Sequence, residues 1–384
     1  MDSTINHSID WQLINKKTVV YFIGEIGLGG SETQLSLLLK YINKKTIKPH
    51  IVVFNKSLYG DLTNRLTDSG VVLHYIPDSI KSIPKRMIFL YRLLLKIKPQ
   101  VIHSWSMHDN IYAGIIGRLL KISSIFGSVR GALHGSTFIR STLLIKLISL
   151  IWVNKIVVNA LSIKEELIAT GIPLKRIIFL PNCVEINQIK DLEKNNNTLE
   201  NEDKDIIICT IGNLRKNKNH LFFVKIMDNI IKSVTNVKGW IIGQPVPDEP
   251  QLENVIRKKI HSMGLEDKII LLGFQDNTTE LLKRSSIYVF TSLSEGTPNT
   301  ILEAMASGLP VISSNVGGIP QIIADGVNGF LFDLNDQYKF EKTIKNLLMN
   351  ERLRKSVGKN AMIYVKKNHD PNKISSILES IYTS

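Results

Sequence analysis

Cysteine is scarce in this chain, which has only Cys183 and Cys209 in 384 residues. Two cysteines are too few for a disulfide framework, and they do not form the C-x2-C spacing of a zinc site. The patterns H-E-x-x-H, G-K-[ST] and G-x-S-x-G are also missing, so a zinc protease, a P-loop NTPase and an α/β-hydrolase lack support. We therefore expect no metal site and a reducing compartment.

Long apolar runs are missing as well. The longest, Ser141 to Val153, is interrupted by Lys146 and is too short to span a bilayer. The segment from Met1 to Lys17 is polar and lacks the basic-then-apolar pattern of a secretory signal. These absences predict a cytoplasmic protein.

Acidic residues are sparse in the first half of the chain. Up to Pro181 there are 23 Lys and Arg against 10 Asp and Glu, whereas the remainder has 25 against 24. The basic excess includes a run of cations between positions 81 and 98, which we call the basic stripe. One interpretation of the basic stripe is an amphipathic helix that is attracted to anionic lipid headgroups, and the other is a solvated helix face. We expect peripheral association with the inner face of the cytoplasmic membrane, and no nucleic-acid partner because no nucleic-acid module is visible. The basic stripe comprises Lys81, Lys85, Arg86, Arg92, Lys96 and Lys98.

Short apolar runs alternate with helical stretches along the whole chain, which predicts parallel βαβ units with helices on both faces. The fold class expected is α/β, with two doubly wound Rossmann-like domains that face each other across a cleft. The predicted limits are 1–185 for the first domain, 186–205 for a polar linker, 206–365 for the second domain, and 366–384 for a C-terminal helix that packs back toward the first domain. The expected strands are Thr18–Ile23, His50–Phe54, Val71–Ile76, Val101–His103, Ile125–Val129, Lys155–Asn159, Ile177–Leu180, Ile206–Ile211, Trp240–Ile242, Ile269–Leu272, Ile287–Thr291, Pro310–Ser313 and Phe330–Phe332.

The most specific segment is S-E-G-T-P-N-T-I-L-E, which runs from Ser294 to Glu303. It follows an expected strand, and Thr297 can cap a helix whose first position is Pro298. Free N–H groups and the helix dipole then make an anion site. Glu295 and Glu303 flank that site and suit neutral hydroxyls, such as those of ribose and a sugar. The segment therefore predicts a binding site for a nucleotide sugar.

A cationic turn, I-G-N-L-R-K-N-K-N-H, follows the first expected strand of the second half. Its Arg215, Lys216 and Lys218 suit a diphosphate, although a solvated turn would look the same. We expect this turn two or three strands away from the Glu295 loop in the same domain. Phe274, at the end of another expected strand, either holds a nucleobase or belongs to the core.

Three glycines, Gly27, Gly29 and Gly30, follow the first expected strand, and Ser31 is placed to cap the next helix. Glu32 occupies the position of the third glycine of a dinucleotide fingerprint and would repel a pyrophosphate. A turn that lets a substrate approach the backbone is the preferred interpretation, and a purely structural turn is the alternative.

Further along, two histidines and a tryptophan lie at the end of a first-half strand, and they either contact a sugar or are structural. These residues are His103, Trp105 and His108.

Several stretches together resemble one family. They are G-G-S-E, L-P-N, G-N-L-R-K-N-K-N-H, L-L-G-F, D-G-V-N-G-F-L-F and the long S-L-S-E-G-T-P-N-T-I-L-E-A-M-A-S-G-L-P-V-I-S-S-N-V-G-G-I-P. The chain is similar to the retaining nucleotide-sugar glycosyltransferases of family 4, also called group 1, which have the GT-B fold. The resemblance covers most of the chain and is most specific in the last third.

The resemblance implies a role for each matching residue. Glu303 would hydrogen-bond the ribose hydroxyls, and Glu295 with the backbone of Gly296 to Thr300, including Thr297 and Asn299, would hold the donor sugar and the distal phosphate. Lys218 would neutralise the diphosphate, and Gly29 and Gly30 would let the donor phosphate or the acceptor approach. Phe274 would lie beside the base.

The chain departs from the family pattern at four places, one of which is a shortened G-x-G-P turn that reads Gly243-Gln244-Pro245. Asn213 stands where the family often has Arg, and Arg215 is the candidate replacement. Cys183 replaces the glycine of P-N-G-V. Arg130 occupies the place where some members have a histidine near the reacting sugar carbon, so a role that depends on that histidine does not transfer. Arg130 is instead a candidate for contact with the acceptor or sugar, together with His103, Trp105 and His108.

The reaction implied is transfer of a hexosyl group from a nucleoside diphosphate sugar to a hydroxyl, with anomeric retention and without a metal or other cofactor. Lys218, Arg215 and the helix start would stabilise the leaving diphosphate. The basic first half predicts a saccharide or lipid-linked saccharide acceptor of cell-envelope polysaccharide synthesis. A nucleotide-sugar 2-epimerase, a sugar phosphorylase and a non-catalytic sugar-nucleotide-binding protein are the alternatives.

Overall fold

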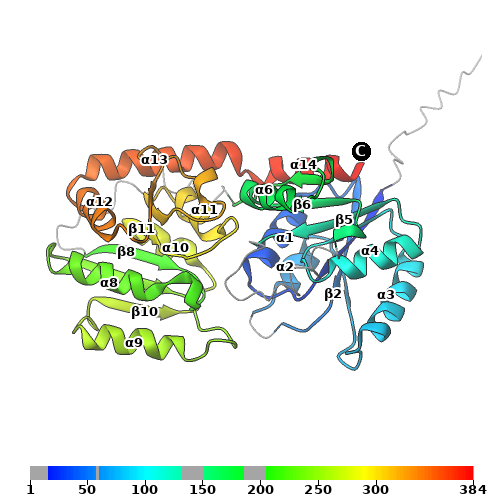
Figure 1. The fold of residues 1–384 in the computed structure, drawn as a ribbon, viewed down its shortest axis with the longest axis horizontal. Coiled ribbons are helices and arrows are strands. Elements are labelled where there is room, and N and C mark those ends of the chain that lie inside the picture. Colours follow the sequence, from blue (N-terminus) through cyan, green and yellow to red (C-terminus); the bar gives the residue numbers. More distant parts are fainter. Residues whose placement is uncertain (1–15, 58–59, 132–149, 186–204, 384) are drawn as a thin grey trace, which may run out of the picture. The chain divides into compact units, whose positions relative to one another are not determined.

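The structure, a computed structural model, describes residues 16–57, 60–131, 150–185 and 205–383. Two parallel sheets and the helices around them make up these residues (Figure 1). Most of the longest apolar run, residues 141–149, and most of the predicted linker, residues 186–204, lie outside the described residues.

The first sheet has seven strands in the order β3-β2-β1-β4-β5-β6-β7. Strand β1 pairs in parallel with β2 and β4, β2 pairs in parallel with β3, and β4 pairs in parallel with β5. The order reverses at β1, as expected for a doubly wound sheet. The strands are β1 (Lys17–Ile23), β2 (Ile47–Val53), β3 (Val72–Tyr75), β4 (Val101–Ser104), β5 (Ser124–Val129), β6 (Lys155–Val158) and β7 (Ile177–Phe179).

The second sheet has six strands in the order β10-β9-β8-β11-β12-β13, all parallel. Here the order reverses between β8 and β11, which pair directly. This reversal places the chain segments that follow β8 and β11 side by side at one edge of the sheet. The strands are β8 (Ile206–Ile211), β9 (Val237–Ile242), β10 (Ile269–Gly273), β11 (Ile287–Phe290), β12 (Val311–Ser314) and β13 (Phe330–Phe332).

Helices connect the strands, as the alternating pattern predicts. The helix over Thr63–Asp68 begins at a residue whose backbone N–H donates to the Asp61 carboxylate over 2.7 Å. The helices are α1 (Gly30–Tyr41), α2 (Thr63–Asp68), α3 (Ile83–Ile97), α4 (Asn110–Leu119), α6 (Leu161–Ala169), α8 (His220–Ile231), α9 (Leu252–Ser262), α10 (Thr278–Arg284), α11 (Asn299–Ala306), α12 (Gln337–Met349), α13 (Glu351–Asn368) and α14 (Pro371–Thr383), with short 3-10 turns at Leu174–Arg176, Lys216–Lys218 and Ile319–Gln321.

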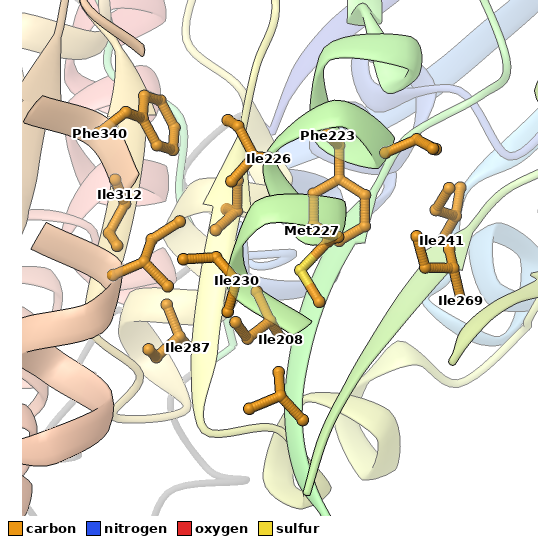
Figure 2. Packing of buried hydrophobic residues seen from close by; sticks show 14 of the residues in the cluster. Ile208, Phe223, Ile226, Met227, Ile230, Ile241, Ile269, Ile287, Ile312 and Phe340 are labelled. Atoms are coloured by element: carbon orange, nitrogen blue, oxygen red, sulfur yellow. The ribbon is translucent and has the colours of Figure 1, made fainter. Parts of the chain in front are cut away.

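The second sheet is buried on both faces. Ile208 packs on one face with α8, α9 and α12, and the neighbouring Cys209 packs on the other with α11 and α13. Figure 2 shows the first of these clusters, in which side chains of α8 such as Phe223 and Met227 gather over strand residues. Alternate residues of a strand point to opposite faces, so a strand covered on both faces is apolar at every position. This explains why β8 is apolar at every position except Thr210, and the two parallel sheets confirm the predicted fold class of two doubly wound domains.

The described chain divides into two compact units. Among the described residues, unit 1 comprises 16–57, 60–128, 150–156 and 375–383, and unit 2 comprises 129–131, 157–185 and 205–374. The boundary between the units falls inside β6. The domain limits predicted from the sequence, with the first domain ending at residue 185 and the second beginning at residue 206, stay a prediction.

The core of unit 1 contains a buried polar contact between β4 and the end of α14. The hydroxyl of Tyr382 lies 2.5 Å from Nδ1 of His103, and the Ser128 hydroxyl lies 2.9 Å from Nε2 of the same ring. Tyr382 also accepts a hydrogen bond at its backbone oxygen from Lys17 Nζ, over 2.8 Å. Residues 375–384 are therefore an integral part of unit 1.

We expect Tyr382→Phe to lower the free energy of unfolding by about 1–3 kcal/mol, because the change removes a hydrogen-bond partner from a buried imidazole nitrogen. Urea unfolding followed by circular dichroism measures the loss. Tyr338→Phe is the matched control, since the Tyr338 side chain is 75% exposed. Equal stability of the two variants would show that the buried hydroxyl contributes nothing.

Candidate functional site

Three glycines end neighbouring strands of the second sheet. Gly243, at the end of β9, has a φ of +148°, and a Cβ atom there would lie 2.7 Å from the carbonyl carbon of Gly212. Gly243 N–H donates to the Gly273 carbonyl over 2.8 Å. Because only glycine lets the backbones approach so closely, this edge of the sheet exposes main chain rather than side chains.

The cationic turn follows β8 and is held by a buried histidine. His220 Nε2 donates to the Asn213 carbonyl over 3.3 Å, and burial lowers the pKa of His220 to about 4. The ring is therefore neutral at pH 7 and positions the turn without adding a charge to it. The preceding residue, Asn219, has a φ of 55° and redirects the chain from the 3-10 turn into α8.

Lys218 and Glu295 meet directly. Their Nζ and Oε1 atoms are 2.5 Å apart, and their side chains are 19% and 13% exposed. The Ser292 hydroxyl donates to the same Oε1 over 2.7 Å, and Lys218 Nζ lies 5.2 Å from the centroid of the Phe290 ring. The two motifs come together because β8 and β11 are adjacent strands, whereas the sequence predicted the motifs to be two or three strands apart.

The backbone of the loop after β11 is tightly held. Gly318 N–H donates to the Gly296 carbonyl over 2.8 Å. Gly317 has a φ of +57°, and a Cβ atom there would lie 2.8 Å from the carbonyl carbon of Glu295. Both glycines belong to the V-G-G-I-P stretch of the sequence. Because they have no side chain, the backbone of this stretch can pack directly against the backbone of the loop after β11.

The helix after this loop begins later than predicted. Helix α11 begins at Asn299, with Pro298 at the N-cap position and no side-chain cap. Thr297 is therefore not the cap, because its hydroxyl donates to the Asn159 carbonyl over 2.8 Å instead. Without a side-chain cap, the first backbone N–H groups of α11, including that of Thr300, are suited to hydrogen-bonding an anion.

Glu303 lies in the second turn of α11 and is partly buried. The hydroxyl of Thr278, at the start of α10, is 3.5 Å from its Oε2 atom. Burial raises the pKa of Glu303 above its usual value, and the Thr278 contact opposes that shift. Because the Thr278 contact is long, it offsets little of the unfavourable burial of the Glu303 carboxylate. Glu303 is therefore a strong hydrogen-bond acceptor for a ligand hydroxyl.

The remaining donor-site candidates are at the surface. Asn213 and Arg215 are exposed on the cationic turn, and Arg215 precedes the 3-10 turn that carries Lys218. Phe274 follows β10 directly and is 41% exposed, so it does not belong to the core. Its predicted place beside a base stays a prediction.

The first-half candidates are more dispersed. His103 and Trp105 are fully buried, and Trp105 Nε1 donates to the backbone oxygen of Ser31, while His108 is exposed. The burial of His103 and Trp105 weighs against a sugar contact, which stays a prediction for all three residues. Their burial follows from β4, which is covered on both faces.

The glycine loop after β1 differs slightly from the prediction. Gly29 is at the N-cap position of α1 and Gly30 is the first helical residue, so Ser31 lies inside the helix and does not cap it. Arg130 follows β5, and its backbone oxygen lies 2.9 Å from where a Cβ atom of Gly296 would stand. That approach explains the glycine at 296. It places Arg130 beside residues 291–298, the loop between β11 and α11 that we call the donor loop, within unit 2.

Several residues of the site were missed from the sequence. Ser292 and Thr278 contact the two carboxylates, and Asn159 and Asn182 hold the donor loop from β6 and from the segment after β7. The L-P-N match to the family was the only available signal for Asn182. Ser292 is the first residue of the S-L-S-E match and lies three positions before Glu295. Thr278 and Asn159 carry no local pattern, because their contacts span 25 and 138 positions of the chain.

Within the described ranges, no three His, Cys, Asp or Glu side chains lie close enough together to hold a metal ion. None of the described helices combines the length and the apolar character needed to cross a bilayer.

Two family models match successive parts of the chain. The model for Glycosyltransferase Family 4 matches residues 28–188, and the model for Glycosyl transferases group 1 matches residues 191–363. This chain belongs to the family 4 (group 1) glycosyltransferases. The prediction of this family from the sequence is confirmed, and with it the assignment of a transferase fold of the GT-B type.

The family 4 relatives extend over most of the chain. A UDP-Gal:alpha-D-GlcNAc-diphosphoundecaprenol alpha-1,3-galactosyltransferase of Escherichia coli is 27% identical over 72% of this chain and 74% of its own. An N-acetylgalactosamine-N,N'-diacetylbacillosaminyl-diphospho-undecaprenol 4-alpha-N-acetylgalactosaminyltransferase of Campylobacter jejuni is 22% identical over 87% of this chain and 91% of its own. Among solved structures, Anabaena HepE in complex with UDP and glucose has a TM-score of 0.81 at 16% identity, over 95% of this chain and 99% of that one.

Proposed function

We propose that this protein transfers a hexosyl group from a nucleoside diphosphate sugar, such as a UDP-sugar, to a hydroxyl of a lipid-linked saccharide in the synthesis of a cell-envelope polysaccharide such as lipopolysaccharide or capsule. The observation that carries this proposal is the contact between Lys218 and Glu295 beside the uncapped start of α11. A cation and free N–H groups suit a diphosphate, and the flanking carboxylates suit sugar and ribose hydroxyls. The two relatives named for transfer to diphosphoundecaprenol-linked sugars support the acceptor class.

Retention of the anomeric configuration is part of the proposal. Glu295 already accepts hydrogen bonds from Lys218 and Ser292 through Oε1, so it is poorly suited to attack the sugar as a nucleophile. In the proposed step the acceptor oxygen bonds to the anomeric carbon on the face that the diphosphate leaves, and the departing phosphate oxygen takes the acceptor proton. Lys218, Arg215 and the start of α11 stabilise the charge that develops on the diphosphate, with no metal or cofactor.

The experiment combines a panel of nucleoside diphosphate sugars with a diphosphoundecaprenol-linked monosaccharide analogue. We expect one donor to raise the melting temperature and to give a disaccharide product whose new linkage is an α-anomer by NMR when the donor sugar is α-linked. The same assay with EDTA tests independence from metals. Epimerised donor without acceptor would identify a 2-epimerase, phosphate-dependent release of sugar phosphate would identify a phosphorylase, and binding without any turnover would leave a non-catalytic binding protein.

The membrane surface is a further part of this proposal, and α3 carries it. Ile88, Tyr91 and Leu95 are spaced on one helix face, and all three are exposed. The cations of the basic stripe flank them, and Lys85 and Arg92 are exposed on the same helix. Apolar side chains bordered by cations are typical of a helix that lies in an anionic lipid surface.

We expect the protein to float with vesicles that contain phosphatidylglycerol at low salt, and Ile88→Glu with Leu95→Glu to reduce the floated fraction several-fold. Ile363→Glu is the matched control, because Ile363 is a similarly exposed isoleucine, on α13 in unit 2, with 53% exposure. Flotation that is unchanged in the α3 variant would show that another surface binds the lipid.

A further inference from the structure

The donor loop begins with two buried hydroxyls, those of Thr291 and Ser292, which are 1% and 0% exposed. The Thr291 hydroxyl lies 3.0 Å and 3.1 Å from two backbone carbonyls of the cationic turn. The Ser292 hydroxyl lies 2.9 Å from a third carbonyl of that turn, the one of Asn217. Ser292 differs from Thr291 because its hydroxyl also reaches the carboxylate of Glu295, at 2.7 Å from Oε1.

The Ser292 hydroxyl has one proton and faces three acceptors. Carbonyl and carboxylate oxygens only accept, so Ser292 can donate to one of them at a time. The Asn217 carbonyl already accepts from the Leu293 N–H over 2.7 Å, and the Ser294 carbonyl is 3.4 Å away. The Glu295 carboxylate is charged and is the nearest of the three acceptors, so it receives the proton of Ser292.

Both side-chain hydrogen bonds to Glu295 therefore end on one oxygen. Lys218 Nζ and the Ser292 hydroxyl donate to Oε1 over 2.5 Å and 2.7 Å. Oε2 accepts from no residue in the part of the chain that the structure describes, and it is not among the buried atoms that lack a partner, so it reaches solvent. Two donors on Oε1 that come from different elements fix the plane of the carboxylate, and with it the direction of Oε2.

We propose that Ser292 is a positioning residue for recognition of the donor sugar. Its hydrogen bond holds the Glu295 carboxylate in the orientation in which Oε2 accepts from a hydroxyl of the sugar. This inference rests on the proposed function and deepens it, because it divides donor recognition between two consecutive hydroxyls. Ser292 acts on the sugar through Glu295, whereas Thr291 holds the backbone of the cationic turn and so acts on the diphosphate through Lys218.

The test compares calorimetric binding of a complete donor with that of the same nucleoside diphosphate without its sugar. The complete donor is the panel member that raises the melting temperature most; for UDP-glucose, the second ligand is UDP. We expect Ser292→Ala to weaken binding of the nucleotide sugar roughly tenfold, about 1.4 kcal/mol, and to leave binding of the nucleoside diphosphate nearly unchanged, because only the sugar meets Oε2. Thr291→Val should weaken binding of both ligands by the same factor.

Ser375→Ala is the matched control. Ser375 is an equally buried serine, 1% exposed, and its hydroxyl donates to the Leu38 carbonyl over 3.0 Å within unit 1. This variant should bind both ligands like the wild type. A double-mutant cycle adds Ser292→Ala to Glu295→Ala, and the second change should cause no further loss of nucleotide-sugar binding, since Ser292 acts only through Glu295.

The outcomes separate this inference from the proposed function. Wild-type protein that binds no nucleoside diphosphate and no nucleotide sugar of the panel would sink the proposed function itself. Binding by the wild type, with an equal loss of both ligands or no loss in Ser292→Ala, would overturn the inference alone, and so would a further loss in the double variant. Thermal unfolding shows whether each variant is folded. If Ser292→Ala is not, Ser292→Cys keeps a side chain of similar size with a weaker donor and should give the same selective loss.

Discussion

Replacing Lys218 by Ala is expected to lower the turnover of sugar transfer by about a hundredfold to a thousandfold, the usual effect of removing one pre-organised group that stabilises developing charge. The Lys218 ammonium is largely buried beside Phe290 and Glu295, so it is held in position and shielded from water. An electrostatic contact in such a place is stronger than one at the surface. The effect should fall on kcat more than on KM, because charge on the diphosphate grows in the transition state.

The measurement is steady-state kinetics with the donor identified by the panel. Lys225→Ala is the matched control, because Lys225 lies on α8 just after the cationic turn and is exposed. Its turnover should stay within about twofold of the wild type, since an exposed cation is screened by water. Near-wild-type turnover in Lys218→Ala would remove this residue from the proposed mechanism.

The second large effect concerns Glu303. Glu303→Ala is expected to weaken nucleotide-sugar binding by roughly 10- to 100-fold, because a hydrogen bond to a charged acceptor contributes about 1.5–3 kcal/mol. The contact is proposed to be with the ribose hydroxyls. Wild-type protein should therefore prefer UDP over 2'-deoxy-UDP, and Glu303→Ala should bind both alike. An equal preference for UDP in the variant would place the ribose contact elsewhere.

Glu303 also predicts a dependence of stability on pH. Burial raises its pKa in the folded state, so the folded protein binds more protons than the unfolded chain in the range between the two pKa values. Stability contributed by Glu303 is therefore present at acid pH and is lost as the pH rises through that range. Glu303→Gln should unfold at higher urea than the wild type at pH 8, and the difference should shrink toward pH 4. A constant difference across this range would contradict the raised pKa.

Much of the fold was predictable from local patterns. Each of the expected strands appears within a few residues of its predicted limits, because an apolar run of strand length between helical stretches is read from neighbouring residues alone. The start of α11 was misplaced by one residue. Thr297 is a favourable cap by type, but its hydroxyl bonds the Asn159 carbonyl, which is 138 positions away. Local propensity was overridden there by a tertiary contact.

The sequence alone determined the family, the two parallel sheets and the acidic and basic residues of the donor motifs, since all of these depend on residue type and short spacing. The tertiary structure decided which of these residues meet. Lys218 and Glu295 are 77 positions apart and form an ion pair because the strand order reverses between β8 and β11. The same kind of contact buries His103 under Tyr382 and sets Asn182 behind the donor loop. Pairings between distant residues follow from the order of strands in a sheet, and no local pattern records that order.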